Sequence, residues 1–185
     1  FRVEPGEARW FSGLPAGVQE LDIPVGKGRE QALLHALWWP AADPAAPALL
    51  YLHGARWNLT GQMFRIEQLH EFGFSVLAVD YRGFGKSSPA LPSEATALED
   101  ARAAWDWLAA REPRAPRYIF GHSLGGLCTV EALSRVKDGS VRRYFAYDPA
   151  IPKPPRSPAL IAIAEKRLDK AGLAEVFRGQ LGPGR

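Results

Sequence analysis

The chain is poor in several residue types, and each shortage excludes a class of protein. The single cysteine, Cys128, excludes a framework of intrachain disulfides and a metal site built from several cysteines. No apolar run is long enough to cross a bilayer. The formal net charge is only +3, which argues against nucleic-acid binding. The 185 residues, of which 46% are hydrophobic and 23% charged, are instead expected to form one globular domain with a sizeable core.

The most informative motif spans residues 121–126, with the sequence GHSLGG. It follows an apolar run typical of a strand and precedes a helical pattern that starts at Leu124. In this context G-x-S-x-G describes a sharp turn that lifts a serine hydroxyl clear of the sheet. Gly121 and Gly125 supply the small residues that the turn needs, because strand and helix backbones come close together there. The motif predicts Ser123 as a nucleophile, with a serine in an ordinary strand-to-helix turn as the alternative.

Hydrophobic periodicity predicts strands that alternate with helices. The expected strands cover residues 18–25, 33–39, 48–52, 75–79, 118–120 and 143–147, and the expected helices cover 62–72, the stretch from the cap Ser93 to Pro113, and 124–136. This alternation indicates an α/β fold with a mostly parallel sheet and helices on both faces. Reacting groups gather at the carboxyl ends of such strands. Three motifs lie at strand ends here: His53-Gly54, residues 80–83 (DYRG) and Ser123.

Three segments together resemble the α/β-hydrolase superfamily and, more narrowly, its Bem46-like bacterial branch. They are residues 51–58 (YLHGARWN), 80–87 (DYRGFGKS) and 121–126 (GHSLGG), which match the family in order and spacing as well as in letters. The resemblance covers residues 18–136, so we expect one α/β-hydrolase domain over residues 1–185. Residues 139–185 do not align with the family. We expect a divergent lid and tail there, in a fold that is truncated or altered at its C-terminal end.

The resemblance implies a serine hydrolase that acts on a small-molecule ester or thioester. Ser123 would attack the carbonyl carbon and form an acyl-serine intermediate. The oxyanion made by that attack needs preorganised donors, and the resemblance implies the backbone amides of Leu124 and Ala55. His53 would shape the oxyanion loop and would not act as the base. A turn without a catalytic role is the alternative for His53-Gly54.

Four residues are expected to lie around the substrate: His53, Gly54, Trp57 and His122. Trp57 follows the oxyanion motif and is expected to line an apolar acyl pocket. The two other histidines, His35 and His70, lie in a predicted strand and a predicted helix and are expected to be structural.

The general base is the part that the sequence does not supply. The family order is nucleophile, acid and then base histidine, but all four histidines precede Ser123. Asp148 is the candidate triad acid, and an aspartate that starts a turn before Pro149 is the alternative. Either the base histidine comes from residues outside this sequence or from a partner chain, or the protein is a catalytically incomplete relative that serves as a binding or interaction domain.

The C-terminal third also differs in composition from the rest. Residues 139–185 hold nine Lys or Arg against four Asp or Glu, whereas the preceding 138 residues hold 14 against 16. Five prolines crowd residues 149–158, where this superfamily often places its lid. A truncation or a shifted reading frame beyond Gly139 would also explain the change.

The remaining features predict no further activity. Residues 85–87 (GKS) end like a phosphate-binding loop, but Asp80 stands where that pattern needs a glycine. Asp80 and Arg82 are expected to brace the loop after their strand, and Cys128 to be a small buried residue. We expect no cofactor and no metal. The chain starts at Phe1, so membrane anchoring is expected only through a missing N-terminal segment, in a cytoplasmic or membrane-associated bacterial protein.

Overall fold

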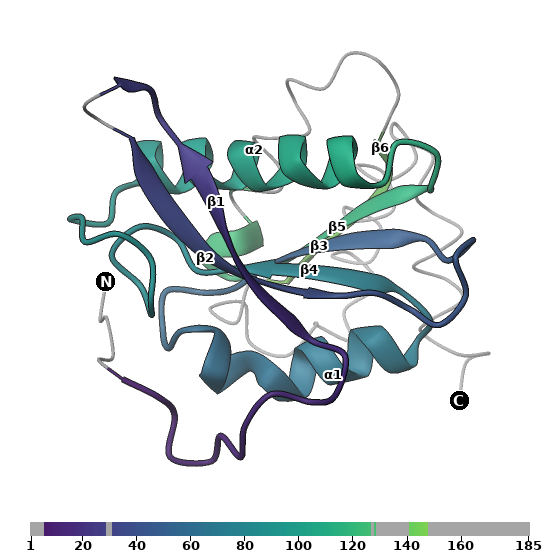
Figure 1. Ribbon diagram of the computed structural model, residues 1–185. Coiled ribbons are helices and arrows are strands. Elements are labelled where there is room, and N and C mark those ends of the chain that lie inside the picture. Colours follow the sequence, from purple (N-terminus) through teal and green to yellow (C-terminus); the bar gives the residue numbers. More distant parts are fainter. Residues whose placement is uncertain (1–5, 29–30, 127, 129–140, 148–185) are drawn as a thin grey trace, which may run out of the picture.

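Six strands form one mixed sheet in a computed structural model that describes residues 6–28, 31–126, 128 and 141–147 (Figure 1). The spatial order is β1-β2-β4-β3-β5-β6. The bounds are β1 (Gln19–Val25), β2 (Ala32–Trp39), β3 (Ala48–Leu52), β4 (Ser75–Val79), β5 (Arg117–His122) and β6 (Val141–Tyr147). Strand β2 is antiparallel to both β1 and β4, and the other neighbouring pairs are parallel. The mostly parallel sheet predicted from the sequence is confirmed.

Helices cover both faces of the sheet. The 3-10 helix η2 (Leu59–Gln62) leads directly into α1 (Met63–Glu71), and α2 (Glu94–Arg111) lies between β4 and β5 in the chain. Figure 1 shows α1 on one face of the sheet and α2 on the other. The helix after β5 begins at Leu124. These layers agree with the predicted architecture.

The central strands are short apolar runs because both of their faces are buried. Every residue of β3 and β4 is buried. Leu50 of β3 belongs to the core beneath α2, whereas Leu49 belongs to the core beneath α1. Trp38 and Trp39 of β2 also divide between the two cores, since successive side chains of a strand point to opposite faces.

Helix α2 begins where its cap predicts. The Ser93 hydroxyl accepts a hydrogen bond from the Thr96 amide at 3.1 Å, and the Thr96 hydroxyl accepts one from the Ser93 amide at 3.0 Å. This reciprocal capping box satisfies two backbone donors at the start of the helix. The helix ends at Arg111, two residues before Pro113, which cannot continue a helix.

The predicted elements agree with the structure apart from their ends. The predicted helix over 62–72 is α1 preceded by η2, and β5 and β6 are each longer than predicted. Three predicted features lie outside the described residues: Asp148, the proline-rich stretch 149–158 and the helix end near residue 136. Within the described part of the chain, no helix has the length and apolar character needed to cross a membrane.

Candidate active site

The turn after β5 has the strained backbone that the G-x-S-x-G motif predicts for a nucleophile elbow. Ser123 has a φ of +56°, a left-handed conformation that residues other than glycine rarely adopt. It joins the end of β5 to a helix that starts at Leu124, and the Gly126 amide donates to the Ser123 carbonyl at 2.8 Å. A Cβ at Gly125 would lie 2.0 Å from the Leu52 carbonyl oxygen, so only glycine fits there. Strand and helix therefore approach as closely as the motif predicts.

The loop after β3, residues 53–59, runs directly against this elbow. A Cβ at Gly54 would lie 3.0 Å from the Cβ of Ser123 and 3.0 Å from Nδ1 of His122. The Gly125 amide donates to the His53 carbonyl at 3.2 Å. Gly54 thus lets the loop that carries the Ala55 amide pass beside the serine. The Leu124 amide belongs to the first turn of a helix, where backbone N–H groups have no partner within the helix.

Asp80, directly after β4, contacts both ends of this 53–59 loop. Its Oδ1 lies 3.2 Å from Nε2 of His53, at ion-pair distance without hydrogen-bond geometry, and accepts a hydrogen bond from the Leu59 amide at 2.9 Å. His53 is fully buried, its Nδ1 lies 2.6 Å from the Gly54 carbonyl oxygen, and its own carbonyl accepts a hydrogen bond from the Tyr81 hydroxyl at 3.2 Å. The loop is therefore held at its start and at its end by one carboxylate.

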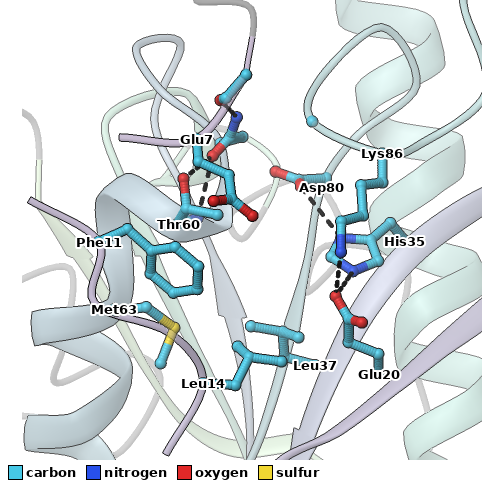
Figure 2. A pocket seen from close by; sticks show the side chains of 13 residues that line it. Glu7, Phe11, Leu14, Glu20, His35, Leu37, Thr60, Met63, Asp80 and Lys86 are labelled. Atoms are coloured by element: carbon cyan, nitrogen blue, oxygen red, sulfur yellow. Dashed lines mark hydrogen bonds and ion pairs between the residues drawn. The ribbon is translucent and has the colours of Figure 1, made fainter. Parts of the chain in front are cut away.

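A row of charged groups runs from Asp80 to the surface (Figure 2). His35 of β2 places Nδ1 3.4 Å from Asp80 Oδ2 and Nε2 3.1 Å from Glu20 Oε1, and Lys86 Nζ lies 2.5 Å from that same Glu20 oxygen. Asp80 is 1% exposed, whereas the side chains of Lys86 and Glu20 are 58% and 43% exposed. The row Lys86–Glu20–His35–Asp80–His53 alternates in sign whenever its histidines are protonated.

Three members of this row, Glu20, His35 and Asp80, have a pKa that their neighbours shift. Burial on its own would raise the pKa of Asp80, but the nearby imidazole rings of His35 and His53 outweigh burial and hold this pKa below its ordinary value. Burial would likewise lower the pKa of His35, but Asp80 and Glu20 outweigh it and raise that pKa. The hydrogen bond from Lys86 lowers the pKa of Glu20. The ionised forms therefore support one another.

Arg82 pins the loop after β4 to α2, as expected. Its amide donates to Asp100 Oδ2 at 2.8 Å and its Nε to Asp100 Oδ1 at 2.7 Å. The Asp80 carboxylate, in contrast, reaches the preceding loop as well as its own. A Cβ at Gly85, whose φ is +50°, would lie 2.0 Å from Asp80 Oδ2.

The histidines and the cysteine occupy defined surroundings. His70 stacks on Trp39 with ring centroids 3.9 Å apart, and its Nε2 lies 3.2 Å from the Pro40 carbonyl oxygen. His122, at the end of β5, is half-buried beside Ser123. Burial raises the pKa of the Cys128 thiol to about 11, which fits the expected inert buried residue.

A cavity of about 300 Å³ lies beside the charged row and not at Ser123. Figure 2 shows an apolar wall that includes Phe11, Leu14 and Met63, facing a polar wall with His35 and Asp80. Trp57, expected in an acyl pocket, does not line this cavity. Its φ is +66°, and its ring meets that of Trp10 edge-on at 4.7 Å. Its role at an acyl pocket stays a prediction.

Sequence reasoning missed the three outer members of the row: Glu20, His35 and Lys86. Their proximity depends on the pairing of β1 with β2, where Asp22 lies opposite His35, and no local motif encodes that register. A histidine within an apolar strand was the available signal. The described residues hold no group of three or more histidine, cysteine or acidic side chains that could bind a metal ion.

Comparisons with known proteins agree with this geometry. The family described as "Serine aminopeptidase, S33" matches residues 43–174, so the match continues past Gly139, where no alignment with the family was expected. The lysophosphatidylserine lipase ABHD12 of Danio rerio is 32% identical over 143 residues, which are 75% of this chain and 35% of that protein. Protein ABHD12B of Homo sapiens is 33% identical over 127 residues, 67% of this chain and 33% of that protein. The chain thus spans about a third of the length of these curated relatives.

The solved structures show the same fold. The esterase Pf2001 of Pyrococcus furiosus superposes with a TM-score of 0.58 at 22% identity, covering 75% of this chain and 55% of that one. The two curated relatives, from Danio rerio and Homo sapiens, are vertebrate proteins. The narrower assignment to a Bem46-like bacterial branch therefore stays a prediction. The strained Ser123 turn, the order of the strands and the match over residues 43–174 together show that the chain belongs to the serine aminopeptidase S33 family of α/β-hydrolases.

Proposed function

We propose that the protein is a serine hydrolase that cleaves an ester or thioester through an acyl-serine intermediate on Ser123. The observation that carries the proposal is the φ of +56° at Ser123, which persists because Gly125 and Gly54 let two neighbouring backbones close around it. Such strain in a strand-to-helix turn presents the serine hydroxyl at the edge of the sheet.

The proposed reaction has two steps. The Ser123 oxygen bonds to the carbonyl carbon while the carbonyl electron pair moves to oxygen and a base takes the hydroxyl proton. The amides of Leu124 and Ala55 stabilise this oxyanion. The intermediate then expels the alcohol or thiol, which takes the proton from the base. Water attacks the acyl-serine in the same way and releases the acid.

The base is proposed to be a histidine supplied from outside this sequence or by a partner chain. His35 and His53 are engaged with Asp80, and His70 is engaged with Trp39 and Pro40. His122 adjoins the nucleophile in sequence, and its ring lies against Gly54, where Nδ1 would be 3.0 Å from an added Cβ. Asp148 remains the proposed acid, and it lies outside the described residues.

A lysophospholipid acyl ester is the first substrate to test, because the Danio rerio relative is named a lysophosphatidylserine lipase. A fluorophosphonate probe is expected to label Ser123 by forming an O–P bond with loss of fluoride. The wild type should also release p-nitrophenol from short acyl esters, and Ser123→Ala should do neither. Absence of labelling and turnover in a folded wild type that includes the source of the base histidine would contradict the proposal.

A second candidate, a catalytically incomplete binding domain, is favoured by the position of all four histidines before Ser123. It predicts that lysophosphatidylserine raises the melting temperature of the wild type without being cleaved. Cleavage of the lipid by wild type but not by Ser123→Ala would exclude it.

A further inference from the structure

We propose that Asp80 is a positioning residue that holds the oxyanion loop against Ser123, and that His35 keeps Asp80 in place. The inference rests on the proposed function, because it concerns the geometry of that same site. It assigns a role to a charged row that the acyl-transfer step itself does not use.

Asp80 contacts the loop at two points. Oδ1 of Asp80 lies 3.2 Å from the His53 ring and accepts the Leu59 amide at 2.9 Å. These two residues bound the segment that carries the Ala55 amide. A single atom therefore fixes the span of the loop, and moving it would shift both ends together.

The Asp80 side chain has little conformational freedom of its own. The backbone of Gly85 packs so closely on Oδ2 that a Cβ there would come within 2.0 Å. Oδ2 also faces Nδ1 of His35 at 3.4 Å. A buried carboxylate needs such partners because removing one leaves an uncompensated charge. Asp80 thus combines full burial, fixed geometry and contact with both loop ends.

The position of this loop should affect the rate of the reaction. An oxyanion hole acts through donors that are already in place when charge develops. A misplacement of about 1 Å can cost on the order of 100-fold in rate. Because Asp80 touches the loop and not the reacting atoms, its loss should lower kcat and leave KM nearly unchanged.

The test is Asp80→Asn, which keeps the size of the side chain and removes its charge. We expect the rate of fluorophosphonate labelling, and kcat on a p-nitrophenyl ester, to fall on the order of 10- to 100-fold, with KM changed less than about threefold. The labelled fraction at completion should stay the same. A merely structural role would instead lower that final fraction and leave the rate per folded site unchanged.

The matched control is Asp100→Asn. Asp100 is also fully buried, but it binds Arg82 and does not touch the 53–59 loop. We expect it to lose stability while its folded fraction labels at the wild-type rate. Labelling of Asp80→Asn at the wild-type rate, or an equal loss of rate in both variants, would overturn the inference.

Two further measurements keep the inference testable. If Asp80→Asn does not fold, His35→Gln takes its place. We expect His35→Gln to lower the labelling rate about 3- to 10-fold through the same loop. Labelling of His35→Gln at the wild-type rate would overturn the inference. If the wild type itself does not label, the proposed function fails. Hydrogen exchange over residues 53–59 then decides separately: faster exchange in either variant than in wild type supports the inference, and equal protection overturns it.

Discussion

Asp80 and Asp100 are two fully buried carboxylates near the end of β4, and they differ in what surrounds them. Asp80 faces two histidines and a backbone amide, and the histidines hold its pKa below the ordinary value. Asp100 binds Arg82, yet burial outweighs that partner and raises its pKa. Two buried carboxylates therefore have pKa values shifted in opposite directions, because their partners determine whether the cost of desolvating the charged form is offset.

The two carboxylates also connect different parts of the molecule. Asp100 joins the loop after β4 to α2 and can be understood as bracing the fold. Asp80 joins β2, the 53–59 loop and the loop around Gly85. Only Asp80 contacts the segment next to Ser123. The comparison separates a structural ion pair from one that can affect the candidate site.

The largest effect in this comparison is expected for Gly85→Ala. Its Cβ would meet Asp80 Oδ2 at 2.0 Å, and its φ of +50° is already unfavourable for alanine. We expect a loss of about 3 kcal/mol in the free energy of unfolding, measured in urea. Gly73→Ala is the control, since its φ is +90° but no atom lies within 4 Å of the added Cβ. It should lose only about 1 kcal/mol from backbone strain, and equal losses would contradict the predicted contact with Asp80.

The next effect is on the pH dependence of stability. A lowered pKa means that Asp80 contributes stability above the ordinary value of 3.8 and loses it as pH falls through the lower folded value. A raised pKa gives Asp100 the opposite sign: stability is recovered as pH falls toward 3.8. Asp80→Asn should make the acid loss of stability shallower, and Asp100→Asn should make it steeper.

Urea unfolding between about pH 2.5 and 6 measures these slopes. His35 stays protonated over most of this range, because its pKa is raised above the ordinary value of 6.5. Slopes that change in the same direction in both variants would show that the two environments do not differ as described.

The smallest effect is expected at the outer end of the row. Lys86→Met removes an ion pair with Glu20 whose members are about half exposed. Exposed pairs contribute about 0.2–1 kcal/mol, so the melting temperature should change by only a few degrees. The change should shrink further in high salt, because ions screen exposed charges. A loss as large as that of Gly85→Ala would contradict the distinction between the inner and outer parts of the row.

Much of the fold follows from local sequence. The continuous apolar runs of β3 and β4 predict buried parallel strands, and Ser93 marks the start of α2 because its hydroxyl caps the helix. Glycines at the Ser123 turn predict close backbone packing, which Gly125 shows at Leu52. These features are local, since each depends on periodicity, capping or the size of one residue.

The charged row could not be predicted in this way. Glu20, His35, Asp80 and Lys86 come from β1, β2, the end of β4 and the loop after it, and only strand register brings them together. The sequence by itself determined the alternation of strands and helices and the candidate nucleophile Ser123, because those signals lie within a few residues. The tertiary structure alone decided that Asp80 binds both ends of the 53–59 loop, since hydrogen bonds between distant segments depend on how the sheet is assembled.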